Sequence, residues 1–228
     1  MPCVAVLLLL VLAACDKKSD ATAVAGGEKL VRAEEVRPQA EQGDALAQTT
    51  LGKILLEGRG ARPDYTEAAS WLRKAADQGS AEAQFYLAGL YEAGRGVAPD
   101  LAEAVRWNLK AAEAGHADAQ YALALLYALG KGTPKDRPAS VKWFRAAAEQ
   151  GLTEAQFNLA QRYQHGQGVE TNLAEAYKWF ALAAKQGLPD AVKESRPLKA
   201  ELSAAQIAEA EKLANTFVAK KSAPAPRP

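Results

Sequence analysis

The sequence has almost no cysteine. Its 228 residues include only Cys3 and Cys15, both within the first fifteen positions. Beyond Cys15 no thiol is present to form a disulfide, bind zinc or act as a nucleophile. Disulfide scaffolds, cysteine zinc sites and cysteine-dependent enzymes are therefore excluded for the rest of the chain.

An excess of either charge is also missing. The chain carries 28 Lys and Arg against 27 Asp and Glu, a formal net charge of +1 at pH 7. Proteins that bind nucleic acid usually have a clear basic excess. The balance therefore predicts that nucleic acid is not a partner.

Bulky apolar side chains are scarce, whereas alanine is abundant. Aromatic residues make up 7% of the chain, and 51 of the 228 residues are alanine. Alanine has the highest helix propensity, and its small side chain lets helices approach closely. The composition predicts a core of closely packed helices.

The apolar run at residues 4–14 is too short to span a membrane. It has eleven residues, and a spanning helix needs about twenty. This length is typical of the core of a secretory signal peptide. A short buried helix is the alternative interpretation.

The residues after this run resemble the processing site of bacterial lipoproteins. Leu12-Ala13-Ala14-Cys15 matches the lipobox, and a polar stretch follows at once. The resemblance implies a signal peptide at 1–14, acyl chains such as palmitate on Cys15, and a tether at 15–27. It also implies a location at the periplasmic face of a bacterial membrane, where Asp16 directly after the cysteine slightly favours the inner membrane. Two or more acyl chains suffice for stable anchoring.

The chain repeats itself at a step of 36 residues. All four tryptophans follow this step, at Trp71, Trp107, Trp143 and Trp179. So do glycines at 43, 79, 115, 151 and 187 and alanines at 47, 83, 119, 155 and 191. A fixed period of this length is typical of a solenoid of stacked repeats.

Each unit predicts two helices. In the second unit, residues 81–93 carry apolar side chains at helical spacing and predict the first helix. Gly94-Arg95-Gly96 should end this helix, because glycine readily adopts the left-handed conformation common at a helix C-terminus. Asp100 can cap the next helix. The same register holds Asp64, Asp136 and Asn172.

Degenerate units flank the repeats. Residues 28–42 have helical charge patterning without the register tryptophan, which predicts an N-terminal capping helix. Residues 187–221 predict a partial repeat, with a first helix interrupted at Pro197, and a C-terminal capping helix. That last helix begins with the capping box Ser203-Ala204-Ala205-Gln206. Residues 222–228 predict a disordered tail.

The repeated residues resemble the Sel1-like repeat, a relative of the tetratricopeptide repeat. Ala81-Glu82-Ala83-Gln84 matches its Ala-x-Ala-Gln motif, and Gly-x-Gly, Asp and Ala-x-x-Trp follow in order. Four full units fall at 43–78, 79–114, 115–150 and 151–186. The resemblance implies an all-α, right-handed α-solenoid of helix-turn-helix repeats with helical caps.

Residues that could support catalysis are few. The two histidines, His116 and His165, fall in predicted turns and share no metal-ligand spacing. The Gly-x-Gly pairs follow helices and recur in every unit, so helix capping explains them better than phosphate binding. We therefore expect no enzyme activity, no cofactor and no metal site.

The expected function is that of a membrane-anchored interaction scaffold. Extended solenoids commonly bind a protein or peptide in a groove lined by equivalent helices. Two alternatives stay open. Related periplasmic lipoproteins act in cell-wall or exopolysaccharide assembly, and some cysteine-rich relatives have been linked to β-lactam hydrolysis, although their repeated cysteines are missing here.

Helical geometry separates a packing side from a free side on each first helix. The recurring tryptophans are expected to be structural. Tyr86 and Asn158 are expected to face solvent. The recurring aromatic residues Phe85, Tyr121 and Phe157 form either a binding ladder or packing between repeats. Partner-binding candidates are the residues on the free side that vary between units: Lys53, Glu57, Tyr86, Asn158 and Gln161.

Overall fold

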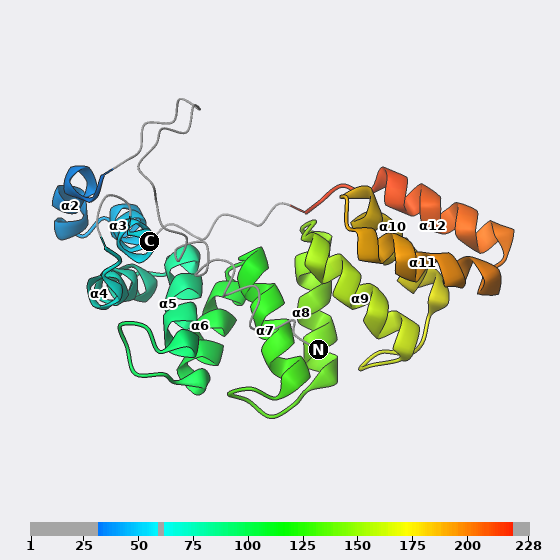
Figure 1. Ribbon diagram of the computed structural model, residues 1–228, viewed down its shortest axis with the longest axis horizontal. Coiled ribbons are helices and arrows are strands. Elements are labelled where there is room, and N and C mark those ends of the chain that lie inside the picture. Colours follow the sequence, from blue (N-terminus) through cyan, green and yellow to red (C-terminus); the bar gives the residue numbers. More distant parts are fainter. Residues whose placement is uncertain (1–31, 59–61, 221–228) are drawn as a thin grey trace. The chain divides into compact units, whose positions relative to one another are not determined.

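The computed structural model describes residues 32–58 and 62–220 (Figure 1). The predicted signal peptide, the tether with Cys15, residues 28–31 of the first cap and the tail at 222–228 lie outside the described residues. Within the described ranges the regular secondary structure is entirely helical. The helices are α2 (Ala33–Glu41), α3 (Ala45–Glu57), α4 (Tyr65–Asp77), α5 (Ala81–Ala93), α6 (Leu101–Glu113), α7 (Ala117–Leu129), α8 (Arg137–Glu149), α9 (Thr153–His165), α10 (Leu173–Lys185), α11 (Pro189–Glu201) and α12 (Ala204–Thr216).

Both predicted ends of the repeat helices are confirmed. The first helix of each repeat ends on a glycine with a left-handed backbone, of which Gly94 at φ 64° is an example. The second helix begins at the predicted cap, where Asp100 accepts hydrogen bonds from the N–H groups of Ala102 and Glu103. Equivalent caps are made by Asp64, Asp136 and Asn172.

The second glycine of the Gly-x-Gly motif is required by a close approach between loops and helices. Gly96 has φ 70°, and a Cβ atom there would lie 2.0 Å from the carbonyl oxygen of Tyr65. A Cβ on Gly168 would likewise lie 2.5 Å from the carbonyl carbon of Arg137. The loop inside one repeat therefore rests directly on the start of the second helix in the preceding repeat.

The glutamine of the Ala-x-Ala-Gln motif closes the turn between successive helices. The side-chain nitrogen of Gln84 donates to the carbonyl of Ala76 at 3.1 Å, and that of Gln156 donates to Ala148 at 3.2 Å. In the last repeat Gln186 donates in turn to the side-chain oxygen of Gln156 at 2.7 Å. The motif thus supplies a buried partner for a carbonyl near the end of the preceding helix.

The described part of the chain divides into two compact units, with the boundary between Lys110 and Ala111. In the first unit α2 packs against α3, α3 against α4 and α4 against α5, and α3 also contacts α5. Leu72 and Leu87 are completely buried in its core among small side chains. The accompanying alanines confirm the close helix packing predicted from composition: Ala68, Ala75, Ala83 and Ala88.

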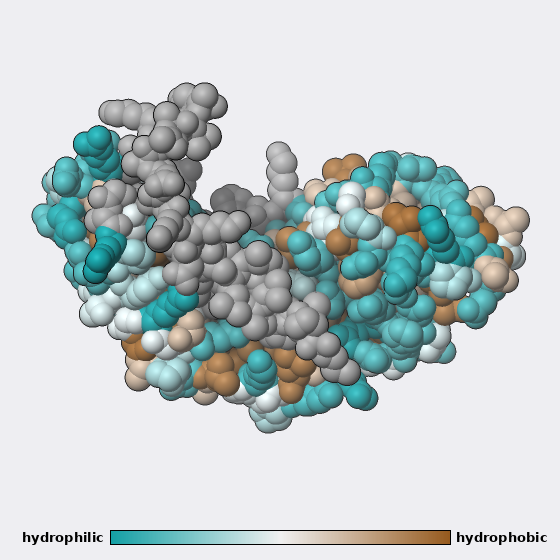
Figure 2. All heavy atoms as spheres, in the orientation of Figure 1, coloured by the Kyte–Doolittle hydropathy of each residue, from teal (hydrophilic) through white to brown (hydrophobic). Residues whose placement is uncertain are grey.

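In the second unit α7 packs against α8, α8 against α9 and α9 against α10, while α10 also contacts α11 and α12. Its largest fully buried side chains include Phe144 and Phe180. On the face shown in Figure 2, apolar side chains outside these cores form separate patches between hydrophilic ones.

The predicted interruption at Pro197 is wrong. Helix α11 runs through Pro197 and ends at Glu201. Proline removes one backbone donor, and the carbonyl left without that donor belongs to Lys193. Lys193 and Pro197 are both exposed, so solvent can serve this carbonyl and the helix tolerates the proline. The capping box of Ser203 and Gln206 at the start of α12 is confirmed.

Both described ends of the chain are held by specific contacts. Arg37 of α2 forms an ion pair with Glu67 of α4 at 2.6 Å. After α12, the ring of Phe217 packs edge-on against Trp179, with 6.2 Å between the ring centroids. The backbone N–H of Lys220 then donates to the carbonyl of Glu149 at 2.8 Å. We call residues 217–220 the C-terminal strap.

Candidate interaction surfaces

Three of the candidate residues lie on the first helices of the first unit. Lys53 of α3 forms an ion pair with Glu82 of α5 at 2.5 Å. Its ammonium group also lies 5.5 Å from the centre of the Tyr86 ring. Burial would lower the pKa of Lys53, but the hydrogen bond from Lys53 to Glu82 and the nearby Tyr86 outweigh it and raise the pKa. We call Lys53, Glu82 and Tyr86 the Lys53 cluster; Glu57 is half-buried at the end of α3.

The other two candidates lie on α9 in the second unit. The amide nitrogen of Asn158 donates to the hydroxyl of Tyr121 at 3.2 Å and to the carbonyl of Glu154 at 2.8 Å. Gln161, one helical turn further on, is half-buried. The structure therefore brings Lys53 and Tyr86 together within one unit, and it places Asn158 and Gln161 on one helix of the other.

The expectation that Tyr86 and Asn158 face solvent is wrong. Both are half-buried, Tyr86 against the core of the first unit and Asn158 against Tyr121. Phe85 and Tyr121 are only 6% and 5% exposed, and Phe157 lies 5.4 Å from the ring of Phe180. Of the two interpretations of these recurring aromatic residues, packing is the one that the structure favours.

The register tryptophans differ in how deeply they are buried. Trp71, Trp107 and Trp179 are buried, whereas Trp143 is half-buried. The indole N–H of Trp71 donates to Glu67 at 3.1 Å, and that of Trp179 donates to Glu175 at the same distance. The hydrogen bonds from Arg37 and Trp71 lower the pKa of Glu67. Burial with a satisfied indole, as at Trp71 and Trp179, is typical of a structural position.

The histidines have ordinary surroundings. The ring nitrogen Nδ1 of His116 accepts a hydrogen bond from the backbone N–H of Ala119 at 3.3 Å. His116 therefore acts as the N-cap of α7, a role usually taken by Ser, Thr, Asp or Asn. His165 is exposed at the end of α9. No group of three or more metal-ligating side chains gathers among residues 32–58 and 62–220.

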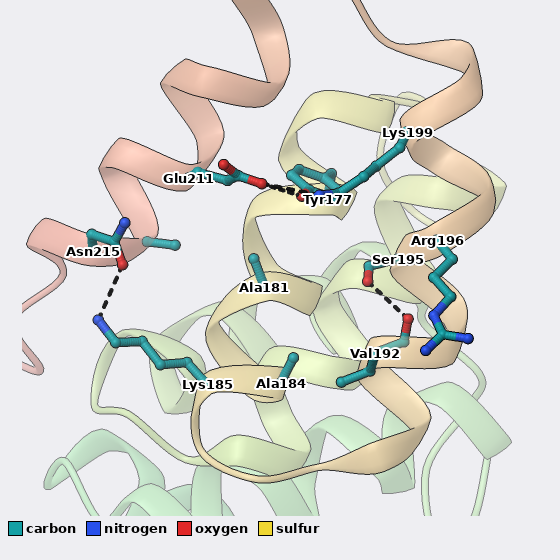
Figure 3. Close-up of a pocket in the computed structure, with 11 residues that line it drawn as sticks. Tyr177, Ala181, Ala184, Lys185, Val192, Ser195, Arg196, Lys199, Glu211 and Asn215 are labelled. Atoms are coloured by element: carbon teal, nitrogen blue, oxygen red, sulfur yellow. Dashed lines mark hydrogen bonds and ion pairs between the residues drawn. The ribbon is translucent and has the colours of Figure 1, made fainter. Parts of the chain in front are cut away.

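A cavity that the sequence does not predict lies between α10, α11 and α12 (Figure 3). Its volume is about 580 Å³, within the range typical of ligand pockets. Glu211 on α12 accepts hydrogen bonds from the hydroxyl of Tyr177 at 2.7 Å and from Lys199 at 3.2 Å. These two donors lower the pKa of Glu211. We call this space the cap cavity, because it is formed by the C-terminal capping helices.

The arrangement of paired helices, repeated with the same caps and the same buried positions, is that of a helical-repeat scaffold. The model of the Sel1 repeat family matches residues 45–80, 81–116, 117–152 and 153–188. These bounds have the predicted period and begin two residues later than the predicted units. The chain belongs to the Sel1 repeat family.

Solved structures agree with this assignment. The chain is similar to a Sel1 repeat protein from Oxalobacter formigenes, with 28% identity, a TM-score of 0.67, and 82% of this chain and 84% of that chain covered. It is also similar to a protective antigen present in uropathogenic Escherichia coli strains, with 31% identity and a TM-score of 0.54. That alignment covers 83% of this chain and 49% of the antigen. The search of curated proteins found no match.

The family defines a general role. Sel1 repeat proteins are generally protein-interaction scaffolds and bind protein partners, and the repeat typically forms a non-catalytic framework. In the described part of this chain, no helix combines the length and the apolar character needed to cross a membrane.

Proposed function

We propose that this chain is a lipid-anchored interaction scaffold of the bacterial cell envelope. It binds a protein or peptide partner through the first helices of its repeats and performs no catalysis. One observation carries the binding role: the packing frame is constant, while the residue at the register of Lys53 changes from unit to unit. The later units carry Gly89, Leu125 and Gln161 there; Lys53 and Gln161 are half-buried and partly reach solvent, whereas Gly89 and Leu125 are buried.

The polar side chains at these positions suit a protein ligand. Lys53, Glu82 and Tyr86 present a cation, a carboxylate and an aromatic ring within one cluster. Interfaces between proteins are enriched in aromatic residues and contain hydrogen-bonded polar groups, so Tyr86 is the member of the cluster that this composition supports. The near-zero net charge disfavours nucleic acid as the ligand.

The anchoring part of the proposal rests on the N-terminal sequence. Leu12-Ala13-Ala14-Cys15 follows an apolar run of signal-peptide length. Acylation of Cys15 would hold the mature chain at the periplasmic face of a membrane, with the inner membrane favoured by Asp16. The predicted tether at 15–27 would give the scaffold reach from the lipid surface.

Capture of partners by the tagged full-length protein tests the binding role. Because Tyr86 and Asn158 contribute to packing, the better probe is Lys53→Gln combined with Gln161→Ala. We expect this pair to reduce capture of a specific partner from envelope extracts about tenfold, which corresponds to about 1.4 kcal/mol. Mass spectrometry of the captured proteins measures the loss.

The matched control is Arg106→Gln combined with Lys142→Gln. Both side chains are exposed on the second helices α6 and α8, so this pair also changes one polar side chain on each of two helices, but away from the first helices. It should capture the partner as well as the wild type does. Equal capture by the two double variants would contradict binding through the first helices.

A further inference from the structure

The cap cavity has a surplus of positive charge. Lys185, Arg196 and Lys199 line it together with one carboxylate, that of Glu211. Glu211 is already paired with Lys199 and Tyr177. Two cations are thus left without a carboxylate partner in the cavity.

These two cations have little to hold them. Arg196 on α11 has no hydrogen-bond or ion-pair partner within the described part of the chain, and the only polar contact of Lys185 is with the amide oxygen of Asn215 at 3.3 Å. Neither positive charge is therefore neutralised by a protein carboxylate. A ligand that brings carboxylates to Lys185 and Arg196 would form charge-assisted hydrogen bonds that the protein alone does not make.

An apolar surface of small side chains separates the two cations. Figure 3 shows Lys185 and Arg196 on opposite sides of the cap cavity, with Ala184 and Val192 between them. Val192 is 40% exposed, so its side chain can contact a ligand. These small side chains leave room for an apolar side chain of the ligand.

We propose that the cap cavity binds an acidic peptide segment of a partner protein, in which an apolar residue is flanked by carboxylate side chains. The apolar residue packs on Ala184 and Val192, and the flanking carboxylates reach Lys185 and Arg196. This site lies on α10, α11 and α12, so it is separate from the surface on the first helices described above.

A peptide fits this arrangement better than a phosphate or a lipid headgroup does. A phosphate concentrates its charge on one group and is best held by cations that converge. Here the two cations without a carboxylate partner stand apart, and Glu211 adds a negative charge to the cavity lining. Separate single charges on either side of an apolar residue match the cavity more closely.

Fluorescence anisotropy with the purified full-length protein tests the site. The probe is a fluorescein-labelled pentapeptide with an aspartate-leucine-aspartate core, and its neutral control carries asparagine in place of both aspartates. We expect the acidic peptide to bind at least about tenfold more tightly than the neutral one, because two charge-assisted contacts are lost in the control.

Variants locate the binding. Lys185→Gln combined with Arg196→Gln should weaken the acidic peptide about tenfold, and Val192→Asp should weaken it through charge repulsion. The matched control is Lys193→Gln combined with Lys212→Gln, because these lysines are exposed on α11 and α12 but do not line the cavity. It should change the affinity by no more than about twofold, as expected for surface charges outside a site.

Three outcomes would overturn the proposal. The first is equal affinity for the acidic and neutral peptides. The second is an equal loss of peptide affinity in the cavity and control variants. The third is that the cavity variant loses binding to phosphatidylglycerol vesicles while its peptide binding is unchanged. The Lys53→Gln, Gln161→Ala variant should bind the probe peptide like the wild type. A failure here is therefore distinguishable from a failure of the scaffold surface on the first helices.

Discussion

Asn108 is a polar residue in a core position. The equivalent residues of the other repeats are Leu72, Phe144 and Phe180, all fully buried. Asn108 is also fully buried, but neither its amide nitrogen nor its amide oxygen has a hydrogen-bond partner. The indole N–H of the adjacent Trp107 is unpaired as well. The second repeat thus gives up stability that its neighbours keep.

Replacing Asn108 with leucine should stabilise the protein. The two side chains have the same number of heavy atoms and the other repeats hold leucine or phenylalanine at this position, so Asn108→Leu removes two unsatisfied polar atoms at a site that suits a larger apolar residue. We expect the free energy of unfolding to rise by about 1–3 kcal/mol, measured by urea denaturation. The reverse change, Leu72→Asn, should lower it by at least as much. An unchanged or lower stability of Asn108→Leu would show that the amide is satisfied in solution.

Two turns of the repeat need glycine for different reasons. Gly79 and Gly96 both have positive φ, at 92° and 70°. A Cβ on Gly79 would meet nothing within 4 Å, whereas one on Gly96 would collide with the backbone of Tyr65. Substitutions at the two glycines therefore separate two free-energy costs: that of a left-handed backbone, which both share, and that of a steric clash, which only Gly96 has.

Gly96→Ala should therefore destabilise the protein more than Gly79→Ala does. The left-handed conformation costs an alanine about 1–2 kcal/mol, which both variants incur. Overpacking against Tyr65 adds about 1–3 kcal/mol to Gly96→Ala alone. Thermal melting of both variants measures the difference, and equal losses would contradict a rigid contact between the loop and α4.

The helices and their ends could be predicted closely from the sequence. The period of 36 residues, the glycine pairs and the cap residues such as Asp100 are local signals, and local backbone chemistry decides them. Helix α5 begins and ends at the predicted residues. Pro197 misled the prediction because the cost of a proline depends on whether the freed carbonyl reaches solvent, which the sequence does not reveal.

The surfaces were less predictable. Tyr86 and Asn158 vary between repeats, yet both are half-buried, because the spacing between neighbouring first helices decides their exposure. The cap cavity could not be found in the sequence. Lys185 lies on the last repeat helix, whereas Arg196 and Glu211 come from the two helices that follow the repeats, and only the packing of α11 and α12 on α10 brings them together.

The proposed membrane attachment concerns the molecule as a whole and would depend on one residue, Cys15. We expect Cys15→Ala to move the full-length protein from the membrane pellet to the soluble fraction, because acyl chains supply the anchoring free energy. Cys3→Ala is the matched control, since Cys3 lies in the predicted signal peptide and should leave the location unchanged. Intact mass should show a mature chain that begins at Cys15. An unacylated chain that still begins at Met1 would contradict the proposal.

The uniformity of the repeats also bears on how the gene can change. Each repeat helix has 13 residues, and the caps and glycine turns recur every 36 residues. Unequal recombination between two repeats adds or removes 36 codons. Wherever the crossover falls, each helix is therefore followed by the same kind of helix as before. The number of repeats can thus change by whole helix pairs, and each remaining helix pair still packs against a neighbour of the same kind.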